Sequence, residues 1–389
     1  MDRGAPGGGS GDRVSLRVGY DATPLLPPRT GVGQYTYRLL QALTDRHPEA
    51  EYLLYTNRDA ELLSAPFRST RVIQSGFGAS RWLWLHVALP QLRSAAQPAL
   101  FHFPNAEAPL SLSVPYVLTL HDLSLFRHPS FHPRSRLLTM RLWLPLAARR
   151  AAAIICVSRF TQREARRVLG LANDRLHFIP SAAGPAFRPV TDPAVRRRVA
   201  ETYALPERFL LFVGTLEPRK NLGRLLRACA YLSTRGIAIP LVVAGPKGWG
   251  MRAVQRRFEQ AVRRRQLHWL GFVAQDDLPA IYSLATALVF PSLYEGFGLP
   301  VLEAMACGTA VVMSDRPAHA EIAGGAALTF DPEDVGDMGD AIAQLVSSPT
   351  KLDELRQRGQ ARAAEFSWDH TADQTFRLYQ KVLASAIQH

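Results

Sequence analysis

Cysteine is scarce in this 389-residue chain, which holds only three. Cys156, Cys229 and Cys307 lie far apart and show none of the close pairing that disulfide-rich domains or thiolate zinc sites need. This distribution argues against a disulfide framework and against a zinc module. We expect three reduced and mostly buried thiols.

Long hydrophobic runs are missing as well. The chain has no stretch of about 20 apolar residues, the length that a membrane-spanning helix requires. The apolar segment 137–148 is interrupted by Arg141. Residues 1–13 are rich in glycine and lack the apolar core of a signal peptide, so they predict a flexible tail. We therefore expect a cytoplasmic protein without membrane spans.

Lysine is rare and arginine abundant, with four lysines among 46 basic residues. Residues 1–190 hold 23 basic and 12 acidic side chains, a net charge of +11, whereas residues 191–389 hold 23 and 21, a net charge of +2. A basic half could attract nucleic acid, anionic lipid or a phosphorylated substrate, or it could be an ordinary soluble surface. No helix-turn-helix signature, zinc module or aromatic-rich repeat accompanies it, so we expect no nucleic-acid partner.

Apolar runs alternate with helical patterns in both halves, which is typical of parallel sheets built from strand–helix–strand units. Segment 180–193 is rich in proline and glycine and breaks both patterns, so we expect it to link two domains. The pattern predicts two Rossmann-like domains facing a cleft. Their expected bounds are 14–185 and 186–370, followed by a C-terminal helix over 371–389.

The elements expected from this pattern are numerous. The strands are 16–20, 52–55, 72–74, 100–103, 116–120, 153–157 and 175–179 in the first domain, and 209–214, 240–244, 267–270, 287–290, 310–313 and 327–330 in the second. The helices are 34–44, 81–92, 135–150, 159–169, 221–232, 251–264, 278–284, 301–306 and 335–347, and residues 368–387 form one or two more.

Two glutamates eight positions apart, Glu295 and Glu303, follow the expected strand 287–290. Pro300 suits the first turn of a helix and Gly308 suits the end of one. The sequence therefore predicts that Glu295 lies in a loop and Glu303 in the first helical turn. Ligands bind at this end of parallel strands, beside helix N-termini, so the pair could bind a molecule. The spacing alone equally allows a solvated Glu295 and a Glu303 that favours the helix start.

The segment Glu295-Gly-Phe-Gly-Leu-Pro-Val-Leu-Glu303-Ala-Met-Ala-Cys-Gly resembles the paired-glutamate motif of glycosyltransferase family 4. This family comprises retaining, metal-independent nucleotide-sugar transferases with the GT-B fold. The resemblance extends from residue 14 to residue 381. The other matching segments are Thr30-Gly-Val-Gly-Gln-Tyr35, His121-Asp122, Val157-Ser-Arg-Phe160, Val213-Gly-Thr-Leu-Glu-Pro-Arg-Lys-Asn221 and Val243-Ala-Gly245. The implied fold is α/β GT-B, with the C-terminal helix returning to the N-terminal, acceptor-side domain.

The resemblance also implies roles for charged residues. Glu303 would bind the ribose hydroxyls of the nucleotide and Glu295 the hydroxyls of the donor sugar, because a carboxylate accepts several hydrogen bonds. Arg219 and Lys220 would neutralise the donor diphosphate; otherwise they are surface charges beside a helix start. Many family members carry arginine where this chain has Thr215, so Arg219 is expected to take over that duty.

The remaining implied site residues are glycines, amides and a histidine. A loop containing Gly31 and Gly33 would lie against the diphosphate and the acceptor, although a Gly-x-Gly alone also fits a tight turn. His121 would face the donor sugar with Asp122 orienting it, whereas a lone histidine is more often structural. The backbone amides expected to add sugar and phosphate contacts are those of Phe297, Gly298 and Leu299.

The function implied by the resemblance is transfer of mannose from GDP-mannose to a glycan or lipid-linked acceptor. UDP-glucose-type transferases, epimerases and phosphorylases with the GT-B fold stay open as alternatives. A dinucleotide-dependent oxidoreductase lacks its glycine fingerprint here, and a nucleic-acid-binding protein would leave the two glutamates unexplained. No Asp-x-Asp is present, so we expect neither a metal ion nor another cofactor.

The arginine-rich half also suits docking at an anionic membrane. Segment 80–90 contains two tryptophans and several leucines, and one face of its expected helix would enter the lipid headgroups if it were exposed. The alternative is an ordinary packed helix. The corresponding expectation is peripheral contact with the inner face of the membrane.

Overall fold

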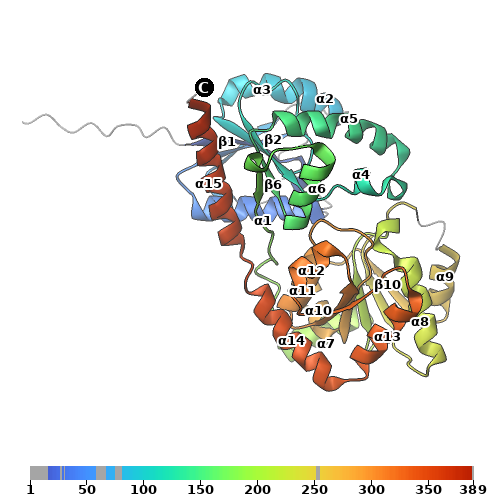
Figure 1. Ribbon diagram of the computed structural model, residues 1–389. Helices are drawn as coiled ribbons and strands as arrows, with labels where there is room; N and C mark the ends of the chain where they lie inside the picture. Colours follow the sequence, from blue (N-terminus) through green and yellow to red (C-terminus); the bar gives the residue numbers. More distant parts are fainter. Residues whose placement is uncertain are drawn as a thin grey trace, which may run out of the picture.

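The computed structural model describes residues 16–26, 29, 31–57, 67–74, 81–250 and 255–387. The expected flexible tail over 1–13, Thr30 of the glycine motif and the first four residues of the expected helix 251–264 lie outside these described residues. The chain forms two domains, each a parallel sheet flanked by helices (Figure 1). This architecture confirms the expected α/β GT-B class.

The N-terminal sheet has seven parallel strands in the order β3-β2-β1-β4-β5-β6-β7. Its central strands are buried along their whole length, which explains why they read as nearly continuous apolar runs in the sequence. The strands are β1 (Arg17–Asp21), β2 (Glu51–Thr56), β3 (Thr70–Gln74), β4 (Leu100–Phe103), β5 (Tyr116–Leu120), β6 (Ala153–Cys156) and β7 (Leu176–Phe178).

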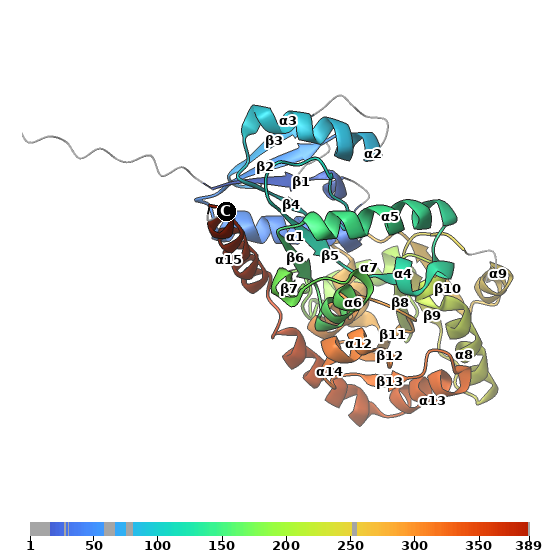
Figure 2. The same ribbon diagram turned by 45° about the horizontal axis from the view of Figure 1, so that its top comes forward.

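Helices cover both faces of this sheet. One face packs on α1 (Gly31–Arg46), and the other packs on α3 (Leu89–Ala96), α5 (Arg134–Arg150) and α6 (Arg159–Leu169). Before α3, the chain forms α2 (Arg81–Leu83) and a π-helical stretch, Trp84–Ala88. A short α4 (Ser124–Arg127), absent from the predicted elements, precedes α5. In both ribbon views α5 and the terminal helix α15 lie on different sides of the domain (Figures 1 and 2).

The start of α1 differs from the expectation. The helix begins at Gly31 and not near residue 34, so Gly31 and Gly33 lie in its first turn and not in a preceding loop. Glycine is tolerated there because the first amides of a helix have no partner within the helix, so helix propensity counts for less than in the interior.

The C-terminal sheet has six parallel strands in the order β10-β9-β8-β11-β12-β13. They are β8 (Leu210–Val213), β9 (Leu241–Ala244), β10 (Leu267–Gly271), β11 (Ala287–Phe290), β12 (Ala310–Ser314) and β13 (Leu328–Phe330). Every strand that the sequence predicted is therefore present.

Three helices of this domain were missed in the sequence. The missed helices are α7 (Pro193–Thr202), α12 (Pro317–Ala323) and α14 (Pro349–Ala363). All three begin with proline, which breaks a helical pattern in the interior but fits the first turn. The others are α8 (Leu222–Thr234), α9 (Gln255–Arg263), α10 (Leu278–Leu284), α11 (Leu299–Ala306) and α13 (Val335–Val346).

The terminal helix α15 (Trp368–Ile387) returns to the N-terminal domain, as the resemblance implied. It is one continuous helix that begins three residues before the expected bound and lies along α1 (Figure 1). Tyr379 Oη and His102 Nδ1 are 2.6 Å apart, and Arg46 Nε donates to Asp373 Oδ1 at 2.7 Å. The chain crosses between the domains twice, in segment 180–193 and at the start of α15. Thr371 Oγ1 donates to the carbonyl of Pro180 at 2.7 Å, so these two crossings are in contact.

Candidate active site

Two neighbouring strands of the C-terminal sheet end beside one another. The chain leaves β8 and forms the turn Pro218–Lys220, and it leaves β11 into the loop that leads to α11. Because β8 and β11 are adjacent and parallel, their carboxyl ends lie at the same edge. The amide of Leu293 donates to the carbonyl of Arg219 at 2.9 Å and holds the two loops together.

The two loops form a cluster of four charged side chains. Lys220 Nζ donates to Glu295 Oε1 at 2.6 Å, and Arg219 Nη1 donates to the other carboxylate oxygen, Oε2. Arg219 also donates from Nη2 to Glu217 Oε1 at 2.6 Å. The side chains of Arg219, Lys220 and Glu295 are 14%, 11% and 10% exposed, so water screens these contacts only partly. The two positive and two negative charges balance within the cluster.

Glu295 is held as a carboxylate. Burial by itself would raise its pKa, but Arg219 and Lys220 outweigh burial and lower the pKa to about 2. The ammonium of Lys220 also lies 5.2 Å from the centre of the Phe290 ring, so it meets the face of an aromatic side chain on the other side. The sequence-predicted residues Arg219, Lys220 and Glu295 therefore form one connected group.

Glu303 lies apart from this cluster. It is the fifth residue of α11, in the second turn and not in the expected first turn, because the helix starts at Leu299. Tyr282 of α10 donates from its hydroxyl to Glu303 Oε2 at 2.9 Å. Burial raises the pKa of Glu303 to about 7, and the Tyr282 hydrogen bond and the positive charge of Arg38 oppose this rise. Its ionisation is thus poised near neutral pH.

The turn between the two glutamates needs its glycines. Gly298 has φ of 122°, a conformation that favours glycine, and it precedes the first residue of α11. A Cβ atom on Gly296 would lie 1.6 Å from the carbonyl oxygen of His121, so this backbone touches the other domain. The amides of Phe297, Gly298 and Leu299 have no acceptor within the described residues, as expected for groups at a helix N-terminus.

His121 follows β5 directly, and its backbone carbonyl lies against Gly296, the residue after Glu295. Its Nε2–H donates to the carbonyl of Pro104 at 2.7 Å, and its ring meets the Tyr35 ring edge-on, with the centroids 4.7 Å apart. Burial lowers the pKa of His121, which keeps the ring neutral with Nδ1 free of a proton. The expectation that Asp122 orients this ring is wrong, because Asp122 Oδ1 accepts from the amide and hydroxyl of Ser124.

The two glycines of the N-terminal motif differ in their surroundings. A side chain on Gly31 would meet nothing within 4 Å, whereas a Cβ on Gly33 would lie 2.6 Å from the carbonyl oxygen of Pro24. The space beside Gly33 is thus filled by the chain itself. On the same helix, Gln34 Nε2 donates to Gln275 Oε1 at 3.3 Å, so the start of α1 faces the other domain.

Four further residues at the site escaped the sequence analysis. Glu217 pairs with Arg219, and Tyr282 with Glu303. Arg38 of α1 is close enough to Glu303 to interact with it electrostatically. It lies four residues after Gln34 and thus on the side of α1 that faces the other domain, and this spacing could have revealed it as a site residue. His319 is fully buried, bonded through Nδ1 to Ser314 Oγ at 2.7 Å, and burial lowers its pKa to about 4. Nothing in its local sequence separates His319 from an ordinary core residue.

Metal-ligating side chains do not gather at this site. Among the residues that the structure describes, no group of three or more histidine, cysteine, aspartate or glutamate side chains could hold a metal ion. The cysteines are all free, with Cys156 and Cys307 buried and Cys229 half-buried. Within the same ranges, no helix combines the length and the apolar character that crossing a membrane would take.

Comparison with known proteins identifies the family. Two family models match, Glycosyltransferase Family 4 over residues 29–183 and Glycosyl transferases group 1 over residues 197–362. O-antigen chain mannosyltransferase B of Escherichia coli is 31% identical over 386 residues, which cover 94% of this chain and 99% of that protein. The chain belongs to glycosyltransferase family 4. This glycosyltransferase is therefore an enzyme of the hexosyltransferase class, similar to bacterial mannosyltransferases.

Solved structures share the fold of this glycosyltransferase. Sucrose-phosphate synthase from Thermosynechococcus elongatus superposes with a TM-score of 0.77 at 21% identity, over 95% of this chain and 100% of that one. Anabaena Alr3699/HepE, in complex with UDP-glucose, superposes with a TM-score of 0.74 at 18% identity, over 94% and 99%. At these identities the likeness confirms the GT-B fold alone.

Proposed function

We propose that this glycosyltransferase moves mannose from GDP-mannose to a hydroxyl of a glycan or lipid-linked acceptor, with retention of the anomeric configuration. The observation that carries the proposal is the cluster of Arg219, Lys220 and Glu295 at the edge of the C-terminal sheet, with Glu303 nearby on α11. The paired cations fit a diphosphate, and the two carboxylates fit hydroxyl groups. A nucleotide diphosphate sugar contains both kinds of group.

The cluster explains how the donor diphosphate would be bound. Lys220 Nζ donates one hydrogen bond, to Glu295, and retains two N–H groups for a phosphate oxygen. Arg219 donates to Glu217, Tyr294 and Glu295 and retains one N–H group, on Nη2. The unpaired amides at the start of α11 add donors at the positive end of a helix dipole. Because these groups can donate hydrogen bonds to the diphosphate oxygens without a bridging cation, we propose that the reaction needs no metal ion.

The same groups support bond cleavage. In the proposed reaction an acceptor hydroxyl oxygen forms a bond to the anomeric carbon of mannose, and the bond from that carbon to the diphosphate oxygen breaks. The acceptor proton passes to the departing diphosphate, whose growing negative charge Arg219 and Lys220 stabilise. Neutral His121, whose backbone carbonyl lies against Gly296, is placed to bind a sugar hydroxyl through Nδ1. The products are the mannosylated acceptor and GDP.

Mannose is favoured because O-antigen chain mannosyltransferase B matches nearly the whole chain. A second donor, UDP-glucose, is favoured only by the fold likeness to Anabaena HepE, whose structure contains UDP-glucose. A thermal-shift screen of nucleotide diphosphate sugars separates the two, because a bound donor raises the melting temperature. We expect GDP-mannose to give the largest rise, and a larger rise with UDP-glucose would overturn the choice of mannose.

We also propose that the enzyme reaches its acceptor at an anionic membrane. The described residues include nine exposed large hydrophobic side chains, and six of them lie on α2, the following π-helical stretch and α5. We call these six the apolar face. Its members are Trp82, Leu83, Val87, Leu138, Leu142 and Leu146.

The apolar face forms one surface. Leu138, Leu142 and Leu146 are spaced by four residues and thus form one stripe along α5, with exposed fractions of 70%, 61% and 46%. Trp82 and Trp143 link the two helices through rings 6.3 Å apart. In the stretch 81–88, Trp84, Leu85 and Ala88 are buried, and Trp82, Leu83 and Val87 are exposed.

The charge around the apolar face suits anionic lipid. Four arginines on α5 are exposed beside the leucine stripe: Arg134, Arg141, Arg149 and Arg150. Residues 81–150 contain only two acidic residues, Glu107 and Asp122, and Glu107 pairs with Arg81. Apolar side chains flanked by arginine are typical of surfaces that lie in the lipid headgroup layer. Only the α5 part of the face follows His121 in the chain, with α4 between them.

A further inference from the structure

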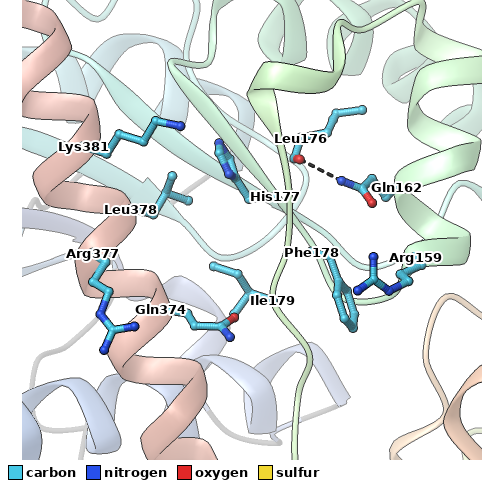
Figure 3. Close-up of a pocket in the computed structure, with 10 residues that line it drawn as sticks. All are labelled: Arg159, Gln162, Leu176, His177, Phe178, Ile179, Gln374, Arg377, Leu378 and Lys381. Atoms are coloured by element: carbon cyan, nitrogen blue, oxygen red, sulfur yellow. Dashed lines mark hydrogen bonds between the residues drawn. The ribbon is translucent and has the colours of Figure 1, made fainter.

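A second cavity lies outside the donor site, at the edge of the N-terminal sheet. It has a volume of about 480 Å³ and is bounded by α6, the edge strand β7 and α15 (Figure 3). Buried Leu176, Ile179 and Leu378 form its apolar part. This volume falls within the range of small-molecule sites. The polar lining residues are Arg159, Gln162, His177, Gln374, Arg377 and Lys381.

The cavity carries positive charge without a neutralising carboxylate in its lining. Lys381 and Arg377 form no ion pair within the described ranges, and the Arg159 guanidinium lies 4.9 Å from the centre of the Phe178 ring. Lys381 points toward His177 at one end, and Arg159 lies at the other end (Figure 3). The charge of Lys381 also contributes, after burial, to lowering the pKa of His177.

Exposed Asp174 acts on His177 from outside the lining, and the acids of α15 and α12 nearest the cavity are engaged with other groups. On α15, Asp369 and Asp373 both pair with Arg46 of α1, so the helix turns its acids toward α1 and its free cations toward the cavity. Glu321 binds the backbone amides of Arg159 and Phe160 and not the Arg159 guanidinium. On α14, by contrast, Arg356, Arg358 and Arg362 each have a carboxylate partner.

We propose that this cavity binds a phosphate ester. The phosphate would lie at Lys381 and His177, with Arg377 one helical turn away on α15, because cations without carboxylate partners attract an anion. The uncharged part of the ester would cover Leu378 and Ile179. Both amides of the lining already bond protein groups, Gln162 Nε2 to the carbonyl of Leu176 and Gln374 Nε2 to the ring of His370, so hydroxyl groups of the ligand would meet the amide oxygens.

The position of the cavity gives the ligand a structural effect. Ile179, at its wall, directly precedes the segment that crosses to the C-terminal domain, and α15 is the second crossing. A ligand that contacts both β7 and α15 would hold the two crossings together, beside the bond from Thr371 to Pro180. Binding is therefore expected to stabilise the folded enzyme in addition to any stabilisation by the donor.

The experiment follows the His177 imidazole by NMR while glycerol 3-phosphate is added to the full-length enzyme. His177 reports on this cavity alone, and the signal is assigned with His177→Gln. We expect a saturable shift that persists in Lys220→Gln, because the donor site does not take part. The double variant Arg377→Gln/Lys381→Gln should bind at least about tenfold more weakly, since it removes two charged hydrogen-bond donors from the phosphate.

A matched control removes two charges elsewhere. Arg256→Gln/Arg257→Gln alters two exposed arginines on α9 and should leave the titration unchanged. The proposal is overturned if His177 does not respond, or if the two double variants lose affinity equally.

A parallel titration with phosphatidylglycerol vesicles identifies the source of the phosphate. Loss of vesicle response in Arg377→Gln/Lys381→Gln would identify a lipid headgroup, and a response to glycerol phosphate alone would identify a soluble ester. The test is independent of the proposed donor.

Discussion

At the residue scale, the proposed chemistry depends on the ion pairs that Glu295 forms with Arg219 and Lys220. In the sequence, Glu295 could equally be a ligand-binding group or a solvated charge, yet the structure holds it as a carboxylate between Arg219 and Lys220. Such a group accepts hydrogen bonds from hydroxyls and is a poor proton donor. Of the two glutamates, Glu303 has the pKa nearer neutral, because burial raises it to about 7.

The first prediction concerns Glu295→Ala. Without this carboxylate, Arg219 and Lys220 lose a shared partner, and the free energy of unfolding should fall by about 3 kcal/mol, as when one member of a buried pair is removed. The freed cations should keep or strengthen the binding of GDP, whereas mannose transfer should fall by at least about a hundredfold, through lost contacts to the sugar. Calorimetric titration with GDP and a transfer assay measure the two effects. Equal losses in both would refute the separation of sugar binding from diphosphate binding.

The second prediction concerns the pH dependence of donor binding. Glu303 is ionised only above a pKa of about 7, and ribose hydroxyls donate best to the carboxylate. Affinity for GDP-mannose should therefore rise roughly tenfold between pH 6 and pH 8, following the ionised fraction of Glu303. Calorimetric titrations at the two values measure this rise. Glu303→Gln should bind more weakly and show no such rise, and an unchanged slope in that variant would assign the titration to another group.

The same group affects stability with the opposite sign. Because the folded protein raises the pKa of Glu303 above its ordinary value of 4.5, folding favours the protonated form. Its contribution to the free energy of unfolding is full below pH 4.5 and is lost as the pH rises through 7. Urea unfolding of the wild type and of Glu303→Gln, compared across this range, isolates the contribution.

Sequence motifs predicted part of the site and missed its supports. Lys220 and Glu295 stand in distinctive segments, so their proximity could be foreseen from the ends of adjacent strands. Tyr282 and Arg38 occupy helical positions that read as core or as surface, and only the folded arrangement brings them near Glu303. Asp122 was expected to orient His121, but the chain turns back so that Asp122 bonds its own neighbour, Ser124.

At the element scale, strands were predictable because buried parallel strands need continuous apolar runs. Helices that are only partly buried were harder to predict from the sequence. Six of the fifteen residues of α14 are charged, and the helix was missed because only a few of its side chains, such as Leu352 and Leu355, are buried. The short helix α12 lies at the cleft, where packing against the other domain replaces a long apolar face.

The third prediction concerns the contact between α12 and α6. Glu321 Oε1 accepts from the amide of Arg159 at 2.6 Å and Oε2 accepts from that of Phe160 at 2.9 Å, so a carboxylate of one domain caps a helix of the other. Glu321→Gln keeps the shape and loses the charge that favours a helix N-terminus. We expect a loss of about 1 kcal/mol in the free energy of unfolding and a several-fold fall in kcat/KM.

The control for this prediction is Glu354→Gln. Glu354 pairs with Arg358 on the exposed side of α14, far from the cleft in sequence and structure, so its neutralisation should change neither quantity measurably. Urea unfolding and steady-state kinetics supply the data. If both variants behave alike, the cap between the domains contributes nothing.

At the scale of the whole molecule, the two-domain plan and the return of the last helix followed from the sequence. The relative placement of the domains did not, because it depends on contacts between residues far apart in the chain. One such contact is the hydrogen bond from Trp249 Nε1 to the carbonyl of Phe131, 2.6 Å long. Another is the approach of Gly296 to the carbonyl of His121. No local pattern encodes either contact.

The fourth prediction tests the apolar face. Leu138→Gln/Leu142→Gln removes two leucines that would be buried in the headgroup layer, and co-sedimentation with phosphatidylglycerol vesicles should weaken by at least about tenfold. Added salt should also weaken wild-type binding, because the flanking arginines act through charge. Val262→Gln/Phe272→Gln changes two exposed apolar residues of the other domain and serves as control. Equal binding by both double variants would place the membrane contact elsewhere, and indifference of the wild type to lipid charge would eliminate it.

The central claim is tested most directly by the transfer of labelled mannose. The purified enzyme is incubated with GDP-mannose and with glycan-bearing, lipid-linked acceptors extracted from bacterial membranes, in the presence of a metal chelator. The account predicts GDP release, label in the acceptor with the α-configuration of the donor retained, and loss of transfer in Lys220→Ala. Transfer that requires a divalent metal, that inverts the configuration, or that occurs from UDP-glucose and not from GDP-mannose would contradict it.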